Sequence, residues 1–427
     1  MSPQNRPEAG AAGLVLGVVG CGVMGRGIAQ IAALGGAEVR MCDSQAGAAD
    51  AALTTLQQTF AKLAEKGKLD AADARDAAAR VQPCGDLAEL AGCHVVVEAI
   101  VENLDAKKTL FANLEQVVDA ETILATNTSS LSVTAIAAGL RHPARVAGFH
   151  FFNPVPLMKI VEVIAGFHTA PQVTDYLLAL GRRWGHTAVR ASDTPGFIVN
   201  HAGRGYGTEG LRLLAEGVAS IATLDEILRD TAGFRLGPCE LLDLTGLDVS
   251  HPVMESVYRQ YYEEPRFRPQ VLTRQMLVAG ALGRKTGHGF YRYDADGRKI
   301  AAPEPGQAPT AMPETVWLSG ERPDLAERVG PMIAAAGVSV ESGARPSERA
   351  LCIVTPLGED ATACCMRENL DARRTVAVES LFDTSRRRVV MTTPATSAET
   401  LAMARGLFGA TGIPVSVIRD STGLVTQ

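Results

Sequence analysis

The chain has 427 residues, of which 46% are hydrophobic and 21% charged, and its formal net charge is −6. This length accommodates two or three domains, and the composition is that of a globular chain rather than a disordered or collagenous one. The small negative charge gives no reason to expect a nucleic acid or a membrane surface as a partner. No apolar run approaches membrane-spanning length. Residues 1–13 lack the apolar core of a secretory signal, so we expect a disordered tail there.

The cysteines indicate where the protein works. They show no paired metal-ligand spacing and several fall in apolar strands, so we predict buried thiols, no bound metal, and a reducing, cytoplasmic compartment. The eight are Cys21, Cys42, Cys84, Cys93, Cys239, Cys352, Cys364 and Cys365.

From Leu14 to about Asp193, short β-type runs alternate with helical stretches, which predicts an α/β domain with a doubly wound sheet over residues 14–194. The expected strands are Leu14–Val19, Glu38–Cys42, His94–Ala99, Ile123–Thr126, Arg145–His150, Ile160–Ile164 and His186–Val189. The long stretch from Ala46 to Arg80 is alanine-rich and charged, and it predicts a pair of helices with a turn near Gly67 that projects from the sheet.

A glycine-rich turn follows the first expected strand and opens a helix, which is the context that a dinucleotide-binding fingerprint requires. Gly20 allows the tight turn, Gly22 lets the backbone approach a diphosphate, and Gly25 lets the helix pack closely. The turn Gly20, Gly22, Val23, Met24 and Gly25 is therefore predicted to bind the cofactor at the positive end of the helix.

The carboxylate that ends the second expected strand points to the identity of the cofactor. Asp43 lies where an acid can accept hydrogen bonds from ribose hydroxyls and repel a 2′-phosphate, which favours NAD over NADP. The nearby Arg40 complicates this preference, because an arginine can accommodate a 2′-phosphate.

Pro195 and Gly196 mark a boundary, after which helical patterns replace strands, so we predict a helical domain over residues 195–293. Its expected helices are Glu209–Gly217, Thr223–Ala232, His251–Glu263 and Pro269–Ala279. Residues 294–313 hold four prolines among small residues, which is typical of a linker.

The last section, residues 314–427, alternates again and is expected to be a small, degenerate Rossmann-like α/β domain. Its expected strands are Val316–Leu318, Val338–Glu341, Leu351–Thr355, Thr375–Glu379, Arg388–Thr392 and Pro414–Ile418, with helices at Asp324–Ala336 and Ala398–Phe408. Gly412–Gln427 parallels Gly185–Asn200, which indicates a duplicate of the first domain. Leu318–Pro323 stands where the glycine turn would be, and Ala377–Asp383 contains no histidine, so we predict a catalytically dead domain.

Several motifs, in order, resemble those of the L-3-hydroxyacyl-CoA dehydrogenases of β-oxidation, over about Leu14 to Tyr293. The matching segments are Gly17–Ala29, Val95–Leu104, Thr126–Leu131, His150–Val163, Asp193–Asn200 and Gly283–Tyr291. The resemblance implies oxidation of a 3-hydroxyacyl-CoA ester by NAD in fatty acid metabolism, and a homodimer formed through the helical domain.

By this resemblance His150 is the catalytic base and Glu162 orients it, while Ser129 and Asn200 contact the reacting oxygens of the substrate. The remaining implied site residues are Asn153 near the nicotinamide, Glu102, Lys107 and Lys285 in the NAD site, and Lys62 at a CoA phosphate.

The chemistry itself favours this pair of residues. Oxidation of a secondary alcohol needs a base with a pKa near the working pH, which an imidazole supplies, and a carboxylate to stabilise the imidazolium. His150 and Glu162 can meet if the strand Ile160–Ile164 runs back beside the strand that His150 ends.

Other interpretations stay open. The acyl group could be 3-hydroxybutyryl or 3-hydroxyadipyl, as in butanoate or polymer metabolism or in aromatic degradation, and a non-catalytic CoA- and NAD-binding protein is the alternative of another class. The glycines Gly203, Gly205, Gly207 and Gly210 after Asn200 depart from the pattern of the family. They weaken any helix there, by about 1 kcal/mol each relative to alanine.

Overall fold

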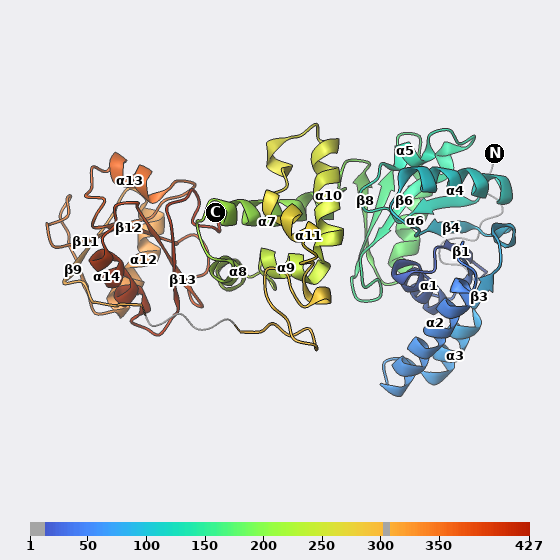
Figure 1. The fold of residues 1–427 in the computed structure, drawn as a ribbon, viewed down its shortest axis with the longest axis horizontal. Helices are drawn as coiled ribbons and strands as arrows, with labels where there is room; N and C mark the ends of the chain where they lie inside the picture. Colours follow the sequence, from blue (N-terminus) through green and yellow to red (C-terminus); the bar gives the residue numbers. More distant parts are fainter. Residues whose placement is uncertain (1–12, 302–307) are drawn as a thin grey trace. The chain divides into compact units, whose positions relative to one another are not determined.

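The fold is known from a computed structural model, which describes residues 13–301 and 308–427 (Figure 1). The chain forms two compact units, Met1–Ala202 and Gly203–Gln427. The expected fold class, an α/β domain followed by helices and a second small α/β domain, is confirmed. The predicted tail, except Gly13, and the centre of the predicted linker lie outside the described residues.

An eight-stranded sheet organises the first unit, in the order β3-β2-β1-β4-β5-β6-β7-β8. Its strands are β1 (Val15–Val19), β2 (Glu38–Cys42), β3 (Val81–Cys84), β4 (Val95–Glu98), β5 (Ile123–Thr126), β6 (Val146–Phe151), β7 (Ile160–Ala165) and β8 (Thr187–Ser192). All neighbours are parallel except β6 and β7. The edge strand β3 was not expected from the sequence, because Val-Gln-Pro-Cys is short and holds a proline, which is tolerated at a sheet edge.

Helices cover both faces of this sheet, as a parallel sheet requires. They are α1 (Val23–Leu34), α2 (Ala48–Glu65), α3 (Ala71–Ala79), α4 (Leu104–Val117), α5 (Val133–Ala137) and α6 (Pro171–Arg183). One core joins the strands to α1, α2, α3 and α6, and a second core joins the opposite face to α4 and α5. The predicted helical pair is α2 and α3, which extends away from the sheet in Figure 1.

The helical part of the second unit follows α7 (Val199–Ala215), which begins in the first unit. Its helices are α8 (Ile221–Asp230), α9 (Pro238–Thr245), α10 (Leu247–Gln260) and α11 (Val271–Val278). Helix α7 runs through Gly203, Gly205, Gly207 and Gly210, so these glycines do not break it. Within residues 13–301 and 308–427, no helix is both long and apolar enough to cross a membrane.

A six-stranded sheet forms the last part of the second unit, in the order β10-β9-β11-β12-β13-β14. Its elements are β9 (Thr315–Leu318), α12 (Pro323–Ala335), β10 (Ser339–Val340), β11 (Leu351–Val354), α13 (Ala361–Arg367), β12 (Thr375–Val378), β13 (Arg388–Thr392), α14 (Ala398–Gly409) and β14 (Val415–Ile418). Helices α12 and α14 cover one face. The other face buries α13 together with Val218 and Ile227 from the helical part.

The second sheet reproduces the closing part of the first. In both, one antiparallel pair (β6 with β7, β12 with β13) is followed by a helix and a parallel edge strand. Asp193 accepts hydrogen bonds from the N-terminus of α5, and Asp420 does the same for α13. Phe197 and Leu424 share an unusual backbone φ of 51°. These matches agree with a duplicated domain.

Candidate active site

A histidine and a glutamate face each other across the antiparallel pair β6 and β7. His150 and Glu162 are direct partners in the strand register, so their side chains point to the same side of the sheet. The His150 Nδ1 lies 2.7 Å from Glu162 Oε2, and both side chains are buried. Because Nδ1 donates to the carboxylate, the other ring nitrogen, Nε2, is left to exchange a proton. The sequence analysis expected the two side chains to meet across two strands that run back beside each other.

The carboxylate of Glu162 is held from a second side. Its other oxygen, Oε1, accepts hydrogen bonds from the backbone N–H groups of Ile198 and Val199, each at 2.8 Å. The preceding Phe197 adopts a left-handed backbone conformation that large side chains rarely adopt. These donors satisfy a fully buried acid, which would otherwise be costly, and fix its orientation toward His150.

Aromatic rings pack against the imidazole. The His150 ring centroid lies 4.3 Å from that of Phe152 and 5.7 Å from that of Phe197. The backbone N–H of Phe151 donates to the Asn127 side chain at 2.8 Å, which ties the end of β6 to the loop after β5. The histidine therefore stands on a rigid support, as a catalytic group requires.

Ser129 and Asn200, the predicted substrate contacts, are neighbours. Asn200 Nδ2 donates to the backbone carbonyl of Ser129 at 3.2 Å, and the Ser129 hydroxyl donates to Glu102 at 3.3 Å. The Ser129 N–H also donates to Glu102 at 2.9 Å. Burial alone would raise the pKa of Glu102, but the Lys107 charge and hydrogen bonds from residues 128–130 lower that pKa overall.

The Lys107 side chain is buried and forms two ion pairs, one with the buried Glu98 and one with the more exposed Glu102. Its Nζ lies 2.5 Å from Glu98 Oε1 and 3.3 Å from Glu102 Oε2. Thr126 donates to the remaining oxygen of Glu98 at 2.6 Å. The sequence interpretation missed Glu98 and Thr126. The sequence does contain a sign of the role of Glu98, because a carboxylate at the end of the apolar run Val95–Glu98 needs a cation nearby.

The glycine turn fits a bound diphosphate. A Cβ on Gly25 would lie 1.8 Å from the Gly20 carbonyl oxygen, so this position excludes every side chain. A Cβ on Gly22 would meet no atom within 4 Å, which leaves open space for a ligand. Gly22 precedes α1 without a side-chain cap, so the first N–H groups of the helix are available to an anion.

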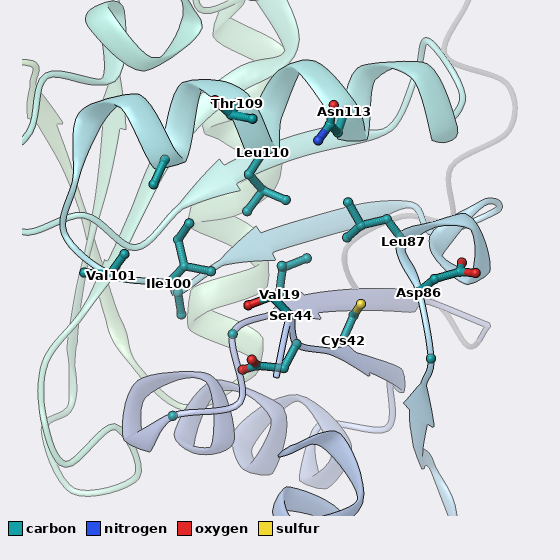
Figure 2. A pocket seen from close by; sticks show the side chains of 16 residues that line it. Val19, Cys42, Ser44, Asp86, Leu87, Ile100, Val101, Thr109, Leu110 and Asn113 are labelled. Carbon is teal, nitrogen blue, oxygen red and sulfur yellow. The ribbon is translucent and has the colours of Figure 1, made fainter. Parts of the chain in front are cut away.

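A cavity of about 720 Å³ opens beside this turn, at the ends of β1 and β4, where the strand order reverses. In Figure 2 helix α4 contributes Thr109, Leu110 and Asn113 to one wall. Three of the predicted cofactor contacts, Gly20, Gly22 and Asp43, line the cavity. The other lining residues, which the sequence interpretation missed, are Val19, Cys42, Ser44, Gly85, Asp86, Leu87, Ala99, Ile100, Val101 and Ala106. Most lie just after strand ends, but nothing in their spacing marks them as cofactor contacts.

Arg40 lies on β2 and Asp43 directly follows that strand, and both bear on the preference for NAD or NADP. Asp43 accepts hydrogen bonds from Cys21 N at 2.7 Å and Gln45 N at 2.9 Å, so it fixes the glycine turn and keeps lone pairs free for a ribose. The Arg40 guanidinium donates to the carbonyls of Glu89 and Ala91 and does not line the cavity. This arrangement favours recognition of a ribose by Asp43 over recognition of a 2′-phosphate by Arg40, and therefore NAD over NADP.

The structure does not bring the remaining predicted contacts to the cavity. Val23 and Met24 lie on the first turn of α1 without lining it. Asn153 is exposed, as is Lys62 on α2. Lys285 belongs to the second unit, where its Nζ lies 2.5 Å from Asp248 Oδ1.

Comparison with known proteins names the family. The family model of the 3-hydroxyacyl-CoA dehydrogenase NAD binding domain matches residues 15–194, and that of the C-terminal domain matches residues 196–293. A probable 3-hydroxybutyryl-CoA dehydrogenase of Deinococcus radiodurans is 40% identical over 277 residues, which are 65% of this chain and 99% of that protein. The chain belongs to the 3-hydroxyacyl-CoA dehydrogenase family.

Two Escherichia coli proteins extend the comparison. A 3-hydroxyadipyl-CoA dehydrogenase is 43% identical to this dehydrogenase over 287 residues, which are 67% of this chain and 60% of that protein. A crystal structure of a 3-hydroxybutyryl-CoA dehydrogenase matches 96% of this chain with a TM-score of 0.82 and 33% identity, and 81% of that chain is covered. The similarity therefore extends past residue 293 into the last domain.

The family confirms two predictions, an NAD-dependent dehydrogenase of acyl-CoA esters and NAD as its cofactor. The residues described above suit NAD, because they combine an open glycine turn, a helix N-terminus without a side-chain cap and an acid that lines the cavity.

The last domain of this dehydrogenase lacks the histidine–glutamate pair. Val389 pairs with Ser416 in β14 as Glu162 pairs with Val189 in β8, so Val389 occupies the position of Glu162. The partner of Val389 across the sheet is Glu379, at the position of His150. Glu379 is buried and accepts hydrogen bonds from Leu381 N and Thr426. The absence of a histidine agrees with the sequence interpretation, and catalytic inactivity of this domain stays a prediction.

Proposed function

We propose that this dehydrogenase interconverts (S)-3-hydroxyacyl-CoA and 3-oxoacyl-CoA esters, with His150 as the catalytic acid and base. The observation that carries the proposal is the 2.7 Å contact of a buried imidazole with a buried, fully satisfied glutamate. In the oxidation the substrate's C3 hydroxyl gives its proton to His150 Nε2. NAD, when bound, accepts the hydride that leaves C3.

Glu162 is proposed as a positioning residue for His150. Its negative charge stabilises the imidazolium that forms when Nε2 takes the proton, and its two backbone donors keep it from turning away. Ser129 and Asn200 are proposed to hold the C3 oxygen and the thioester carbonyl. The Asn200 amide donates to the backbone carbonyl of Ser129, which keeps the two residues next to each other.

The cofactor and CoA contacts are also part of the proposal. Gly20, Gly22, Val23, Met24 and Gly25 are assigned to the diphosphate, and Asp43 is assigned to the ribose. Glu102 and Lys107 are proposed to act from the edge of the NAD site, because neither lines the cavity. Asn153 is proposed to lie at the nicotinamide, Lys285 at the NAD site and Lys62 at a CoA phosphate.

We also propose a cytoplasmic homodimer formed through the helical domain. The cysteines are all buried free thiols, which suits a reducing compartment. Val271 and Val278 on α11 are 71% and 82% exposed and offer apolar surface to a second copy. Sedimentation at several protein concentrations tests this proposal, and a monomer at all of them would contradict it.

The decisive experiment is oxidation of NADH in the presence of acetoacetyl-CoA. Turnover is expected, and its loss in His150→Ala with NADH affinity retained would support the assigned base. If the protein binds NADH but turns over no 3-oxoacyl-CoA ester, the alternative of a non-catalytic binding protein takes its place. The relatives named above act on a four-carbon and on a six-carbon dicarboxylic acyl group, so both acyl classes are candidates.

A further inference from the structure

The cofactor cavity of the first unit extends past the residues assigned to the diphosphate and the ribose. The glycine turn follows β1, and Asp43 follows the neighbouring strand β2. The next strand in the sheet is β3, and Gly85, Asp86 and Leu87, which follow it, also line the cavity. A dinucleotide with its diphosphate at the end of β1 and its ribose at the end of β2 therefore brings its base toward the end of β3.

Two leucines give this end of the cavity apolar walls. Leu87 comes from the short turn of helix after β3, and Leu110 comes from α4. In Figure 2 Asp86, Leu87 and Asn113 lie toward one end of the cavity, and Val101 lies toward the other. A planar base can bury its faces against aliphatic side chains, while a few polar groups at its edge determine which base fits.

Asp86 and Asn113 supply polar groups at that end. Asp86 precedes the short helix Leu87–Leu90, and its Oδ1 accepts a hydrogen bond from Ala88 N at 2.7 Å. This bond orients the carboxylate, which has further lone pairs for a ligand. Asn113 is exposed on α4, and its amide offers both a donor and an acceptor.

We propose that Asp86 selects the adenine base of NAD by accepting a hydrogen bond from its 6-amino group, with Asn113 at the neighbouring edge of the ring. This inference rests on the proposed placement of the diphosphate and the ribose, and it adds the residue that determines which base is accepted. An ionised carboxylate only accepts hydrogen bonds, so it suits the amino group of adenine and repels the 6-oxo group of hypoxanthine, which is itself an acceptor. The Asn113 amide can suit either base.

The wild-type protein tests the inference with NADH and its hypoxanthine analogue, deamino-NADH. The two dinucleotides share the nicotinamide, the diphosphate and both riboses, and they differ at the 6-position of the base. Titration followed by the fluorescence of the reduced nicotinamide measures both affinities without any turnover. NADH is expected to bind about 10-fold more tightly, because deamino-NADH brings two acceptors together at Asp86.

Asp86→Asn localises the preference to one side chain. Asparagine also caps helix N-termini, so the variant should keep the hydrogen bond from Ala88 N and fold. Its amide can donate to a 6-oxo group or accept from a 6-amino group. The ratio of the two affinities is therefore expected to fall from about 10 to about 1, mainly through tighter binding of deamino-NADH. Asn113→Ala is expected to weaken both dinucleotides alike and to keep the ratio.

Asp70→Asn is the matched control in the same unit. Asp70 precedes α3 and accepts a hydrogen bond from Ala72 N at 2.7 Å, as Asp86 does from Ala88 N, but it does not line the cavity. This substitution removes one negative charge from the same kind of cap, and both affinities are expected to stay unchanged. An equal fall of the ratio in Asp70→Asn and Asp86→Asn would show that the lost charge, and not a contact with the base, sets the preference.

The outcomes separate this inference from the proposed function. Equal affinities of the wild-type protein for the two dinucleotides, or an unchanged ratio in Asp86→Asn, remove the role of Asp86, while turnover of acetoacetyl-CoA with NADH keeps the proposed function standing. The expected ratio in a protein that turns over no 3-oxoacyl-CoA ester supports the role of Asp86 and removes the proposed function.

Discussion

The first and last α/β domains of this dehydrogenase share a closing antiparallel pair, helix and parallel edge strand, yet the turns after their strands differ. In the first domain the turn after β1 is open at Gly22, α1 begins without a side-chain cap, and a cavity of about 720 Å³ lies beside them. In the last domain Arg367 forms ion pairs with Glu321 and Glu359 at 2.7 and 2.5 Å. These ion pairs link the turn after β9 and the loop after β11 through side chains of the chain itself.

The covered faces of the two sheets also differ. In the first domain α4 and α5 cover the second face. In the last domain α13 covers part of that face, and Val218 and Ile227 of the helical part bury against the rest. Part of the second face of the smaller sheet is therefore buried by the neighbouring helices of the same unit.

The two domains show that a similar arrangement of strands does not determine which reaction a domain catalyses or which ligand it binds. Both sheets place residues at equivalent positions, but one places a histidine and a glutamate where the other places Glu379 and Val389. Function therefore follows from a few side chains at the strand ends and not from the order of the strands.

The largest difference between the two domains is expected when His150 and Glu379, which occupy equivalent positions, are each substituted. His150→Ala should lower kcat by about 10²–10⁴-fold, because the substrate's proton loses its acceptor. Glu162 keeps its two backbone donors, so the variant should fold and bind NADH. The measurement is steady-state turnover of acetoacetyl-CoA together with NADH titration.

Glu379→Gln is the matched variant in the last domain. It keeps the size of a buried side chain that contacts Leu381 and Thr426, and it should leave kcat unchanged. A strong loss of turnover in this variant would contradict the prediction that the last domain is catalytically inactive.

A second contrast concerns the two turns. Gly25→Ala places a Cβ 1.8 Å from the Gly20 carbonyl oxygen, so the turn must shift and NADH affinity should fall by about 100-fold or more. Gly320→Ala, in the corresponding turn after β9, meets no atom within 4 Å and should change nothing. Equal effects of both substitutions on NADH affinity would show that the first turn is not the diphosphate site.

The sequence predicts much of this picture, for physical reasons that the residues make clear. Apolar runs bounded by turns predict thirteen of the fourteen strands found in residues 13–301 and 308–427. The alternation of side chains along two strands that run back beside each other brings His150 and Glu162 together. The strand β3 and helices α9 and α13 were missed because they are short and depend on tertiary contacts. Helix α9, for example, is held by hydrogen bonds from Cys239 N and Glu240 N to the distant Asp225.

The spacing of residues in the sequence does not reveal roles that depend on which side chains lie next to each other in the fold. Lys107 was predicted as a cofactor contact, but the structure buries its charge between Glu98 and Glu102.

A third prediction concerns Asp43, the acid that directly follows β2. Asp43→Ala removes the hydrogen bond to Cys21 N and the proposed contact with the ribose, so NADH should bind about 10–100-fold more weakly. Discrimination against NADPH should fall as well, because the negative charge that repels its 2′-phosphate is lost. Parallel titrations with both cofactors measure these effects. An unchanged preference would remove Asp43 from the cofactor site.

The smallest effect is expected at the contact between the last domain and α8. Arg387 lies 2.8 Å from Asp230 and 3.2 Å from Glu226, so Arg387→Leu should lower the free energy of unfolding by about 1–2 kcal/mol without changing kcat. Arg386→Leu is the control, since Arg386 is 67% exposed and lies 3.5 Å from Asp230.

Arg387→Leu also helps to interpret a truncation of the last domain. Removal of the residues after Pro313 should spare the chemistry if the last domain is inactive, but it would uncover Val218 and Ile227, which are buried against that domain. Destabilisation and loss of chemistry would then be hard to separate. Arg387→Leu weakens the same contact without exposing those side chains. A stable Arg387→Leu protein with reduced kcat would show that the last domain influences turnover. A destabilised protein with unchanged kcat would indicate that the last domain stabilises the helical domain.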